Sequence, residues 1–276
     1  MTSDTTGTTG TTGTSDTSDA PTSTDSPPRL TRLAFHGPLS EARATGIVER
    51  LTGGGRAPRT VLDVGCGWGE LMLRVLAAAP DATGVGVDLN GEDLARGRAE
   101  AERRGLADRV AFVEESGLDS ARGPADVVLC LGASHALSEA EPPLHSAAAL
   151  RALRRLVSPG GRVVLGEGFW QRTPAPDELA HMWPDAHAGQ HIFLGDLVDE
   201  AVAAGFRPLW VETASGAEWE EFESGYRADA EEWLAAHPDH PLAAETRARV
   251  DTQRSSWLRG YRDVLGIAYL TLVPVG

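Results

Sequence analysis

The feature that most constrains the fold of this chain is a regular alternation that begins near residue 59. Short runs rich in β-branched and other apolar residues alternate with longer stretches in which apolar residues recur every three to four positions. Such an alternation is typical of a parallel β-sheet that is covered by helices on both faces. We predict strands at residues 60–64, 83–88, 110–114, 125–131, 162–166, 208–213 and 267–275.

Helices are predicted between these strands, and several of their ends are marked in the sequence. Asn90 is a suitable N-cap for a helix at 91–106, and a helix at 143–157 should stop at the turn formed by residues 158–161, Ser-Pro-Gly-Gly. A further helix is predicted at 195–204. Residues 167–190 interrupt the pattern, and we expect a loop or short-helix insertion of the kind that often covers a substrate.

The region 217–264 predicts two long amphipathic helices that are broken at His237-Pro238. On the first of them, Trp219, Phe222, Tyr226 and Trp233 fall on one face. Such a stripe can pack against the sheet, or it can form an aromatic wall over a substrate. Both interpretations remain open at the level of the sequence.

Composition limits the domain organisation and the compartment. Residues 1–28 are rich in Thr, Ser, Gly, Asp and Pro and have almost nothing apolar to bury, so we expect a disordered tail there and one folded domain over 29–276. The tail has neither the basic start nor the apolar stretch of an export signal. No run is long and apolar enough to span a membrane, and two cysteines in apolar or glycine-rich segments favour free thiols. We therefore expect a soluble, cytoplasmic protein.

Charge excludes several classes of function. The formal net charge is −15, which disfavours binding to nucleic acid because nucleic-acid binders carry basic patches. All basic residues other than histidine are Arg, so a Schiff-base lysine and a lysine-containing phosphate loop are excluded. We expect a small-molecule partner, with no nucleic acid, membrane or metal ion, and the oligomeric state stays open.

The strongest local signal is the segment 61–70, VLDVGCGWGE, in which an apolar strand runs into a glycine loop and a helix. Gly65 and Gly67 let the backbone approach a ligand closely, and Gly69 lets the following helix pack tightly at the turn. A dinucleotide fingerprint would place its third glycine where Glu70 stands, and a carboxylate there disfavours a pyrophosphate. Asp63 at the start of the loop suits a ligand that carries a positive charge.

A second acid follows at the spacing that a nucleoside site requires. Asp88 ends the second predicted strand roughly twenty residues after the glycine loop, where a carboxylate can accept hydrogen bonds from both ribose hydroxyls. The loop and this acid together predict a site for a positively charged nucleoside.

The pattern Asp-x-Gly-x-Gly-x-Gly after an apolar strand resembles the first motif of class I S-adenosylmethionine-dependent methyltransferases, and the resemblance covers about 61–168 and the last strand. It implies a doubly wound, Rossmann-like α/β fold with a seven-stranded, mostly parallel sheet, an antiparallel last strand and a helical cap. It also implies S-adenosylmethionine as the cofactor. The cofactor-binding residues that we predict are Asp63, Gly65, Cys66, Gly67, Gly69, Asp88, Leu89, Glu115, Ser116 and Leu131.

One departure from the family leaves the adenine contact open. The family commonly has Gly-Asp after the third strand, whereas this chain has Glu115-Ser116, and either the serine hydroxyl or the neighbouring carboxylate could replace the missing acid.

Two side chains follow the fourth and fifth strands, where ligands gather in an open α/β sheet. His135 is our candidate general base, with a purely hydrogen-bonding role as the alternative. Glu167 is a candidate catalytic residue, substrate anchor, partner for a cationic acceptor or helix-capping acid. A base matters only when the attacking atom holds a proton, because alignment and desolvation can supply most of the acceleration of methyl transfer.

The segments 166–170, GEGFW, and 218–223, EWEEFE, are similar to bacterial small-molecule methyltransferases that bear a helical cap. This likeness implies cap insertions at about 167–193 and 216–264 and a pocket that the segment 35–38 helps to close. The predicted substrate-binding residues are His36, His135, Glu167, Trp170 and Tyr226. The acceptor should be small and partly apolar, and the acidic chain is compatible with a cationic one. The alternatives are an NAD-dependent oxidoreductase and a non-catalytic protein that binds S-adenosylmethionine.

Overall fold

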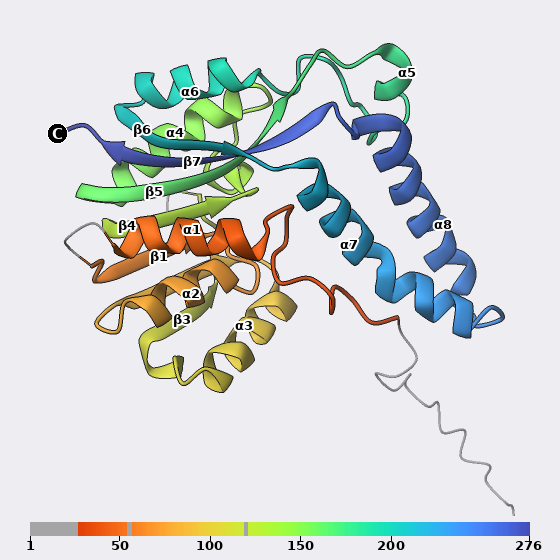
Figure 1. Cartoon of the computed structure of the whole chain (residues 1–276), viewed down its shortest axis with the longest axis horizontal. Helices are drawn as coiled ribbons and strands as arrows, with labels where there is room; N and C mark the ends of the chain where they lie inside the picture. The colour runs from red at the N-terminus through yellow and green to blue at the C-terminus, as the bar shows by residue number, and fades with distance from the viewer. Residues whose placement is uncertain (1–26, 54–56, 119–120) are drawn as a thin grey trace, which may run out of the picture.

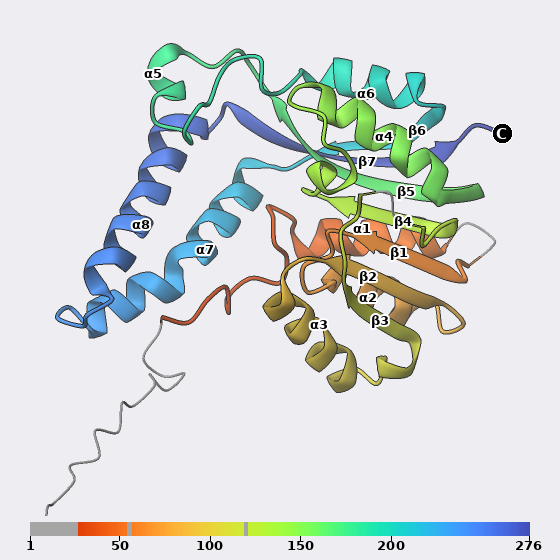
Figure 2. The ribbon, with the colours of Figure 1, turned by 180° about the vertical axis from the view of Figure 1, so that it is seen from behind.

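The computed structural model describes residues 27–53, 57–118 and 121–276, and in them the chain forms a seven-stranded sheet with helices on both faces (Figures 1 and 2). The strand order is β3-β2-β1-β4-β5-β7-β6. Only β7 runs antiparallel to its neighbours β5 and β6. The strands are β1 (Thr60–Val64), β2 (Thr83–Asp88), β3 (Val110–Glu114), β4 (Ala125–Leu131), β5 (Val157–Trp170), β6 (Phe206–Thr213) and β7 (Leu265–Pro274). The predicted fold is confirmed.

The strand β5 is longer than the sequence predicts at both ends. Ala125 of β4 pairs with Val157, and Val127 pairs with Arg162, so the predicted turn at 158–161 loops out inside the strand. At the other end, residues 167–170 pair with β7 and are not part of an insertion. The prediction of a loop from Glu167 was wrong because β7 returns along this edge and continues the ladder, which local sequence does not reveal.

The two faces of the sheet carry two separate cores. The apolar residues of β4 alternate between them: Val127 and Leu129 face one core, whereas Val128 and Cys130 face the other. The first core packs against α1 (Glu41–Thr52), α2 (Glu70–Ala78) and α3 (Gly91–Arg103), and the second packs against α4 (Leu144–Leu156) and α6 (Leu194–Ala203). Asn90 caps α3 as predicted, since its side chain accepts hydrogen bonds from the N–H groups of residues 92 and 93.

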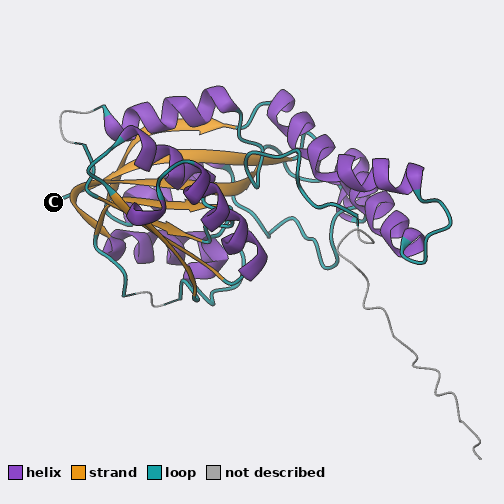
Figure 3. Cartoon of the chain, turned by 90° about the horizontal axis from the view of Figure 1, so that it is seen from below, coloured by secondary structure: helices purple, strands orange, loops and turns teal. Residues whose placement is uncertain are grey.

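A helical arm extends beyond the carboxyl ends of the parallel strands (Figures 1 and 3). It consists of α7 (Gly216–Ala236) and α8 (Ala243–Ser255), which ends in a π-helical turn, η3 (Ser256–Tyr261). The predicted break at His237 is confirmed, because α7 ends at Ala236. The short helix α5 (Pro176–Leu179) lies beside the end of α8 (Figure 1). Single-turn 3₁₀ helices, η1 (Ala107–Arg109) and η2 (Ser134–Leu137), follow α3 and β4.

Of the predicted tail at 1–28, the first 26 residues lie outside the described residues. The described part of the chain has no helix that is long and apolar enough to cross a membrane.

Candidate active site

The glycine loop between β1 and α2 forms the floor of the candidate site. Gly65, Gly67 and Gly69 all have positive φ angles, of 66°, 52° and 67°, which residues with a Cβ rarely adopt. A Cβ on Gly65 would lie 2.2 Å from the Cβ of Ala133, so no larger residue fits there. The loop is tied to β2, because the N–H of Gly67 donates to Asp88 Oδ2 at 2.7 Å.

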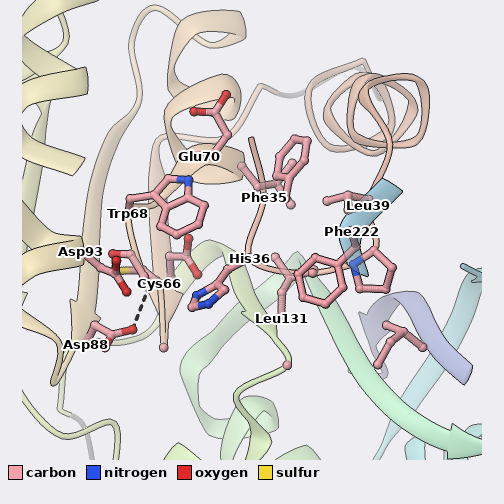
Figure 4. A pocket seen from close by; sticks show the side chains of 18 of the residues that line it. Phe35, His36, Leu39, Cys66, Trp68, Glu70, Asp88, Asp93, Leu131 and Phe222 are labelled. Carbon is pink, nitrogen blue, oxygen red and sulfur yellow. Dashed lines mark hydrogen bonds between the residues drawn. The ribbon is translucent and has the colours of Figure 1, made fainter. Parts of the chain in front are cut away.

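A cavity of about 500 Å³ opens above this loop. Figure 4 shows His36 near its middle, with Cys66, Asp88 and Asp93 on one side and Leu39, Leu131 and Phe222 on the other. The residues that line the cavity come from the loop after β1, the end of β2, the loop after β4, the segment 35–39, α7 and β7. The cavity therefore lies at the carboxyl ends of the parallel strands, where open α/β sheets bind their ligands.

Asp63 is a buried carboxylate at the base of this cavity. Its side chain is 3% exposed, and none of the ion pairs in the described residues involves it. Burial raises the pKa of Asp63 to about 7, and the nearby Asp88 carboxylate adds to the shift. A buried carboxylate without a cationic neighbour fits a ligand that brings its own positive charge.

The segment before α1 folds over the glycine loop. Trp68 is buried beneath this segment, and its indole N–H donates to the carbonyl oxygen of Ala34 at 2.8 Å. The imidazole of His36 stacks on Trp68, with ring centroids 5.0 Å apart. Partial withdrawal of the ring from water lowers the pKa of His36, which the carboxylate of Asp93 opposes. His36 is therefore held over the loop as an uncharged ring.

The start of α7 supplies the aromatic side of the cavity. Trp219 and Phe222 line it, so part of the predicted stripe forms a wall. Tyr226 packs behind Phe222 in the cluster that includes Trp68, and Trp233 lies in a separate core within the arm. The two interpretations of the stripe thus apply to different halves of the helix.

The loop after β4 brings His135 to the cavity. His135 lies on η2, and it and Leu131 both line the cavity. The side chain of His135 is exposed. It follows β4, which lies on the side of β1 opposite to β2 and the α3 that follows β2.

Comparison with known proteins identifies the family. A family model for a methyltransferase domain matches residues 62–163. A structure of an S-adenosylmethionine-dependent methyltransferase from Geobacter sulfurreducens, in complex with S-adenosyl-L-homocysteine, has a TM-score of 0.73 at 26% identity, over 90% of this chain and 98% of that one. The chain is an S-adenosylmethionine-dependent methyltransferase.

Two further similarities differ in extent. The Escherichia coli (strain K12) protein YjhP is 28% identical over 242 residues, which cover 87% of this methyltransferase and 93% of YjhP. A ubiquinone biosynthesis O-methyltransferase of Pseudomonas paraeruginosa is 36% identical over 128 residues, or 46% of this chain and 50% of that enzyme. The similarity to YjhP therefore extends over most of both chains, whereas the similarity to the Pseudomonas enzyme covers half of each.

Among the predicted cofactor residues of this methyltransferase, those that line the cavity are Asp63, Gly65, Cys66, Gly67, Asp88 and Leu131. The other four lie outside its lining. Gly69 starts α2, where a Cβ would lie 2.6 Å from Phe112, as expected of a packing glycine. Leu89 is 70% exposed, Glu115 pairs with Arg122, and the hydroxyl of Ser116 accepts from the N–H of Leu118.

Glu167 is placed differently from the prediction. It is 5% exposed and lies on β5 outside the cavity lining, with its carboxylate 3.6 Å from Nε2 of His145. Hydrogen bonding to this carboxylate raises the pKa of His145. Glu167 was expected at the substrate because the predicted strand ended at Gly166, directly before it. The strand instead continues and turns this side chain toward α4.

Two predicted substrate residues also lie outside the cavity lining. Trp170 is 2% exposed, its indole N–H donates to the carbonyl oxygen of Ala188, and it packs in the core beneath α5. Tyr226 belongs to the cluster behind Phe222. His36 and His135, by contrast, both line the cavity.

Phe35 lines the cavity, as expected of the segment 35–38, but several other lining residues were not predicted from the sequence. They come from segments far apart in the chain: Leu39, Trp68, Asn90, Asp93, Ile267 and Tyr269. Asn90 and Asp93 could have been inferred, because they open the helix that follows Asp88. Ile267 and Tyr269 gave no such signal, since they lie on β7 about two hundred residues after the glycine loop.

Proposed function

We propose that this methyltransferase carries a methyl group from S-adenosylmethionine to a small molecule inside the cavity above the glycine loop. The observation that carries the proposal is Asp63, a buried carboxylate that faces the cavity without a cationic partner among the described ion pairs. The amino group of the cofactor would supply the missing positive charge. A nicotinamide dinucleotide would instead bring a pyrophosphate toward Asp63 and Glu70.

The residues that would hold the cofactor divide by its parts. Asp63 would accept from the ammonium group, and the backbone at Gly65, Cys66 and Gly67 would line the aminoacyl portion. Asp88 accepts from Gly67 and Asn90 through different oxygens, and each oxygen keeps a lone pair for a ribose hydroxyl.

The adenine would lie toward the end of β3. Leu89 is exposed beside the cavity and offers an apolar face to a base. Glu115 and Ser116 follow β3 and remain candidates for the adenine amino group. Leu131 would close the opposite side, near the reacting sulfur.

The acceptor would bind between the cofactor and the arm. We propose that 171–193 and 216–264 act as the cap of the domain formed by residues 29–276, with Trp219 and Phe222 as its contact surface. His36 and His135 are the histidines that line the cavity. Once the cofactor has supplied an electrophilic methyl group, the chain's contribution is to align the acceptor, exclude water and receive a proton.

Charge and composition support the remaining parts of the proposal. The net charge of −15 and the acidic cavity disfavour nucleic acid as an acceptor. The thiols of Cys66 and Cys130 are free, as expected for a cytoplasmic protein.

Calorimetry and a transfer assay test the proposal. We expect S-adenosyl-L-homocysteine to bind while NADH does not, and radiolabelled S-adenosylmethionine to pass its label to a small molecule of a cell extract. Binding without transfer would support a non-catalytic sensor. Binding of NADH alone would overturn the proposal.

A further inference from the structure

The cavity has two ends of different chemistry. At one end lie the carboxylates of Asp63, Asp88 and Asp93, and at the other lie Leu39, Phe222 and Ile267 (Figure 4 labels four of these residues: Asp88, Asp93, Leu39 and Phe222). If the cofactor binds as proposed, its ammonium and ribose take up Asp63 and Asp88. What remains for the acceptor is the apolar, aromatic end.

No arginine is among the described residues that line the cavity. The arginine nearest in the chain to the apolar end is Arg43, and its guanidinium is held by Glu218 and Glu212. The basic groups of the lining are two histidines. The pKa of His36 is lowered by partial withdrawal from water, so this ring does not offer a cation at neutral pH. A carboxylate or phosphate on the acceptor would therefore lose its hydration without gaining an arginine or a charged His36 as its partner.

A cationic acceptor meets the same difficulty at this end of the cavity. The carboxylate of Glu70 lines the cavity but is bound by Arg74 and Arg104, and that of Glu218 is bound by Arg43. Neither is free to balance an ammonium group. An uncharged ring, on the other hand, can lie against the indole of Trp219 and the phenyl ring of Phe222.

We infer that the acceptor is an uncharged aromatic molecule that bears a hydroxyl group, and that His135 receives the hydroxyl proton. This inference rests on the proposed function and adds the class of substrate. The hydroxyl oxygen forms the new bond to the methyl carbon while the carbon–sulfur bond breaks and its electron pair stays on sulfur. The proton of the hydroxyl passes to the imidazole of His135 and then to water, so that atoms and charge balance.

Matched probes separate the charge classes. With S-adenosylmethionine present, methyl 4-hydroxybenzoate should be methylated at least tenfold faster than 4-hydroxybenzoate, which carries a carboxylate, and than tyramine, which carries an ammonium group. Methyl 4-aminobenzoate tests the acceptor atom and should be the poorer substrate. Equal rates for the ester and either charged probe would overturn the inference, as would an absence of both binding and turnover of the ester.

A charge-switch variant gives an independent test. Ile267 lines the apolar end on β7 and is not among the residues that we assign to the cofactor. Ile267→Arg should reverse the preference toward 4-hydroxybenzoate, whereas Ile267→Gln, of similar length and no charge, should not. If Ile267→Arg fails to fold, Leu39→Arg places the cation at another residue of the apolar end. An unchanged preference in a folded arginine variant would contradict the inference.

Calorimetry with S-adenosyl-L-homocysteine on the same samples distinguishes the two levels of failure. Loss of the proposed function would appear as no binding by the wild-type protein. Failure of the inference alone would appear as normal binding of S-adenosyl-L-homocysteine, together with equal methylation rates for the neutral and charged probes or with a faster rate for a charged probe.

Discussion

At the scale of single residues, Asp63 connects the stability of this methyltransferase with its proposed function. A carboxylate that is 3% exposed and has a pKa of about 7 opposes folding, because its unfolded pKa is near 3.8. The folded protein then binds the proton more tightly than the unfolded chain does. The free energy of unfolding of the ligand-free protein should therefore fall as the pH rises from about 4 to about 7.

The variant Asp63→Asn separates these two effects. We expect it to melt at a higher temperature than the wild type at pH 8, because the buried charge is gone. It should also bind S-adenosyl-L-homocysteine about 10- to 100-fold more weakly, since hydrogen bonds to charged groups contribute about 1.5–3 kcal/mol. Melting curves and calorimetry measure the two quantities. Asp93→Asn, in the same cavity, is the control and should change both much less; an equal loss of affinity in both variants would argue against a specific role for Asp63.

The same carboxylate predicts a pH dependence of binding. A bound ammonium group favours the charged form of Asp63 and lowers its pKa, so binding should release a proton near pH 7. Affinity should fall up to tenfold per pH unit below this pKa and level off above it. Calorimetry in buffers of different ionisation enthalpy counts the released proton. The release should disappear in Asp63→Asn, and its persistence there would assign it to another group.

The general base is tested by His135→Gln. Loss of a general base commonly lowers turnover by about 10²- to 10⁴-fold. We expect such a loss in kcat, with an affinity for S-adenosyl-L-homocysteine within about twofold of wild type, because His135 is exposed at the acceptor side. His36→Gln is the matched variant and should raise KM more than it lowers kcat. Unchanged turnover in His135→Gln would leave alignment alone as the source of catalysis.

The residues of the site that could be predicted from the sequence are those positioned by neighbouring elements of the chain. Gly65, Gly67 and Asp88 were predictable because strand, loop and helix are contiguous there. Glu167 and Trp170 were misplaced because pairing with β7 decides where β5 ends, and that partner is distant in the sequence. For the same reason, the sequence did not predict that Ile267 and Tyr269 line the cavity.

At the scale of elements, α1 and α7 are joined at their first turns by one carboxylate. Glu218 accepts from the N–H of Ser215 in a capping box, and from the backbone and hydroxyl of Ser40, which caps α1. Arg43 completes the group with two further hydrogen bonds. Burial alone would raise the pKa of Glu218, but these hydrogen bonds outweigh it and hold the pKa at about 2. The junction therefore joins the two elements whose first turns adjoin the cavity, which the segment 35–39 and Phe222 both line.

Glu218→Gln should loosen this junction. Breaking a buried ion pair while one partner remains typically costs about 3–5 kcal/mol, and a glutamine leaves Arg43 without its strongest partner. We expect a clear fall in melting temperature and faster amide exchange in 35–45. Glu220→Gln lies on the same helix, at an exposed pair with Arg262, and should change little. Equal shifts in the two variants would contradict the assignment of Glu218 as the junction.

The elements themselves were more predictable than their lengths. The bounds of β1 to β4 follow from local apolar patterns and match the prediction residue by residue. The partner of the aromatic stripe of α7 could not be predicted, because the first half of the stripe lines the cavity and the second half packs within the arm. Phe222 meets the cavity, whereas Trp233 meets α8, and only the angle at which the helix leaves the sheet decides where the change occurs.

At the scale of the whole molecule, the sheet and the outer half of the arm have separate cores. The arm's core consists of Ala230, Trp233, Leu234, Ala243 and Val250. It shares no residue with the cores on the two faces of the sheet. No residue of α7 that follows Phe222 in the chain lines the cavity. The outer half of the arm should therefore open without unfolding the sheet.

Trp233→Ala tests this independence. Trp233 is 7% exposed and stacks on His237 with ring centroids 5.1 Å apart, so its removal leaves a cavity in a small core and should cost locally about 3–5 kcal/mol. Hydrogen exchange should become faster in α8 and in the second half of α7, while β1 and β4 keep their protection. The affinity for S-adenosyl-L-homocysteine should stay within about twofold of wild type. Trp210→Ala, at a half-exposed tryptophan on β6, is the control and should leave exchange in the arm unchanged. Loss of protection throughout the sheet in Trp233→Ala would instead mean that arm and sheet fold as one cooperative unit.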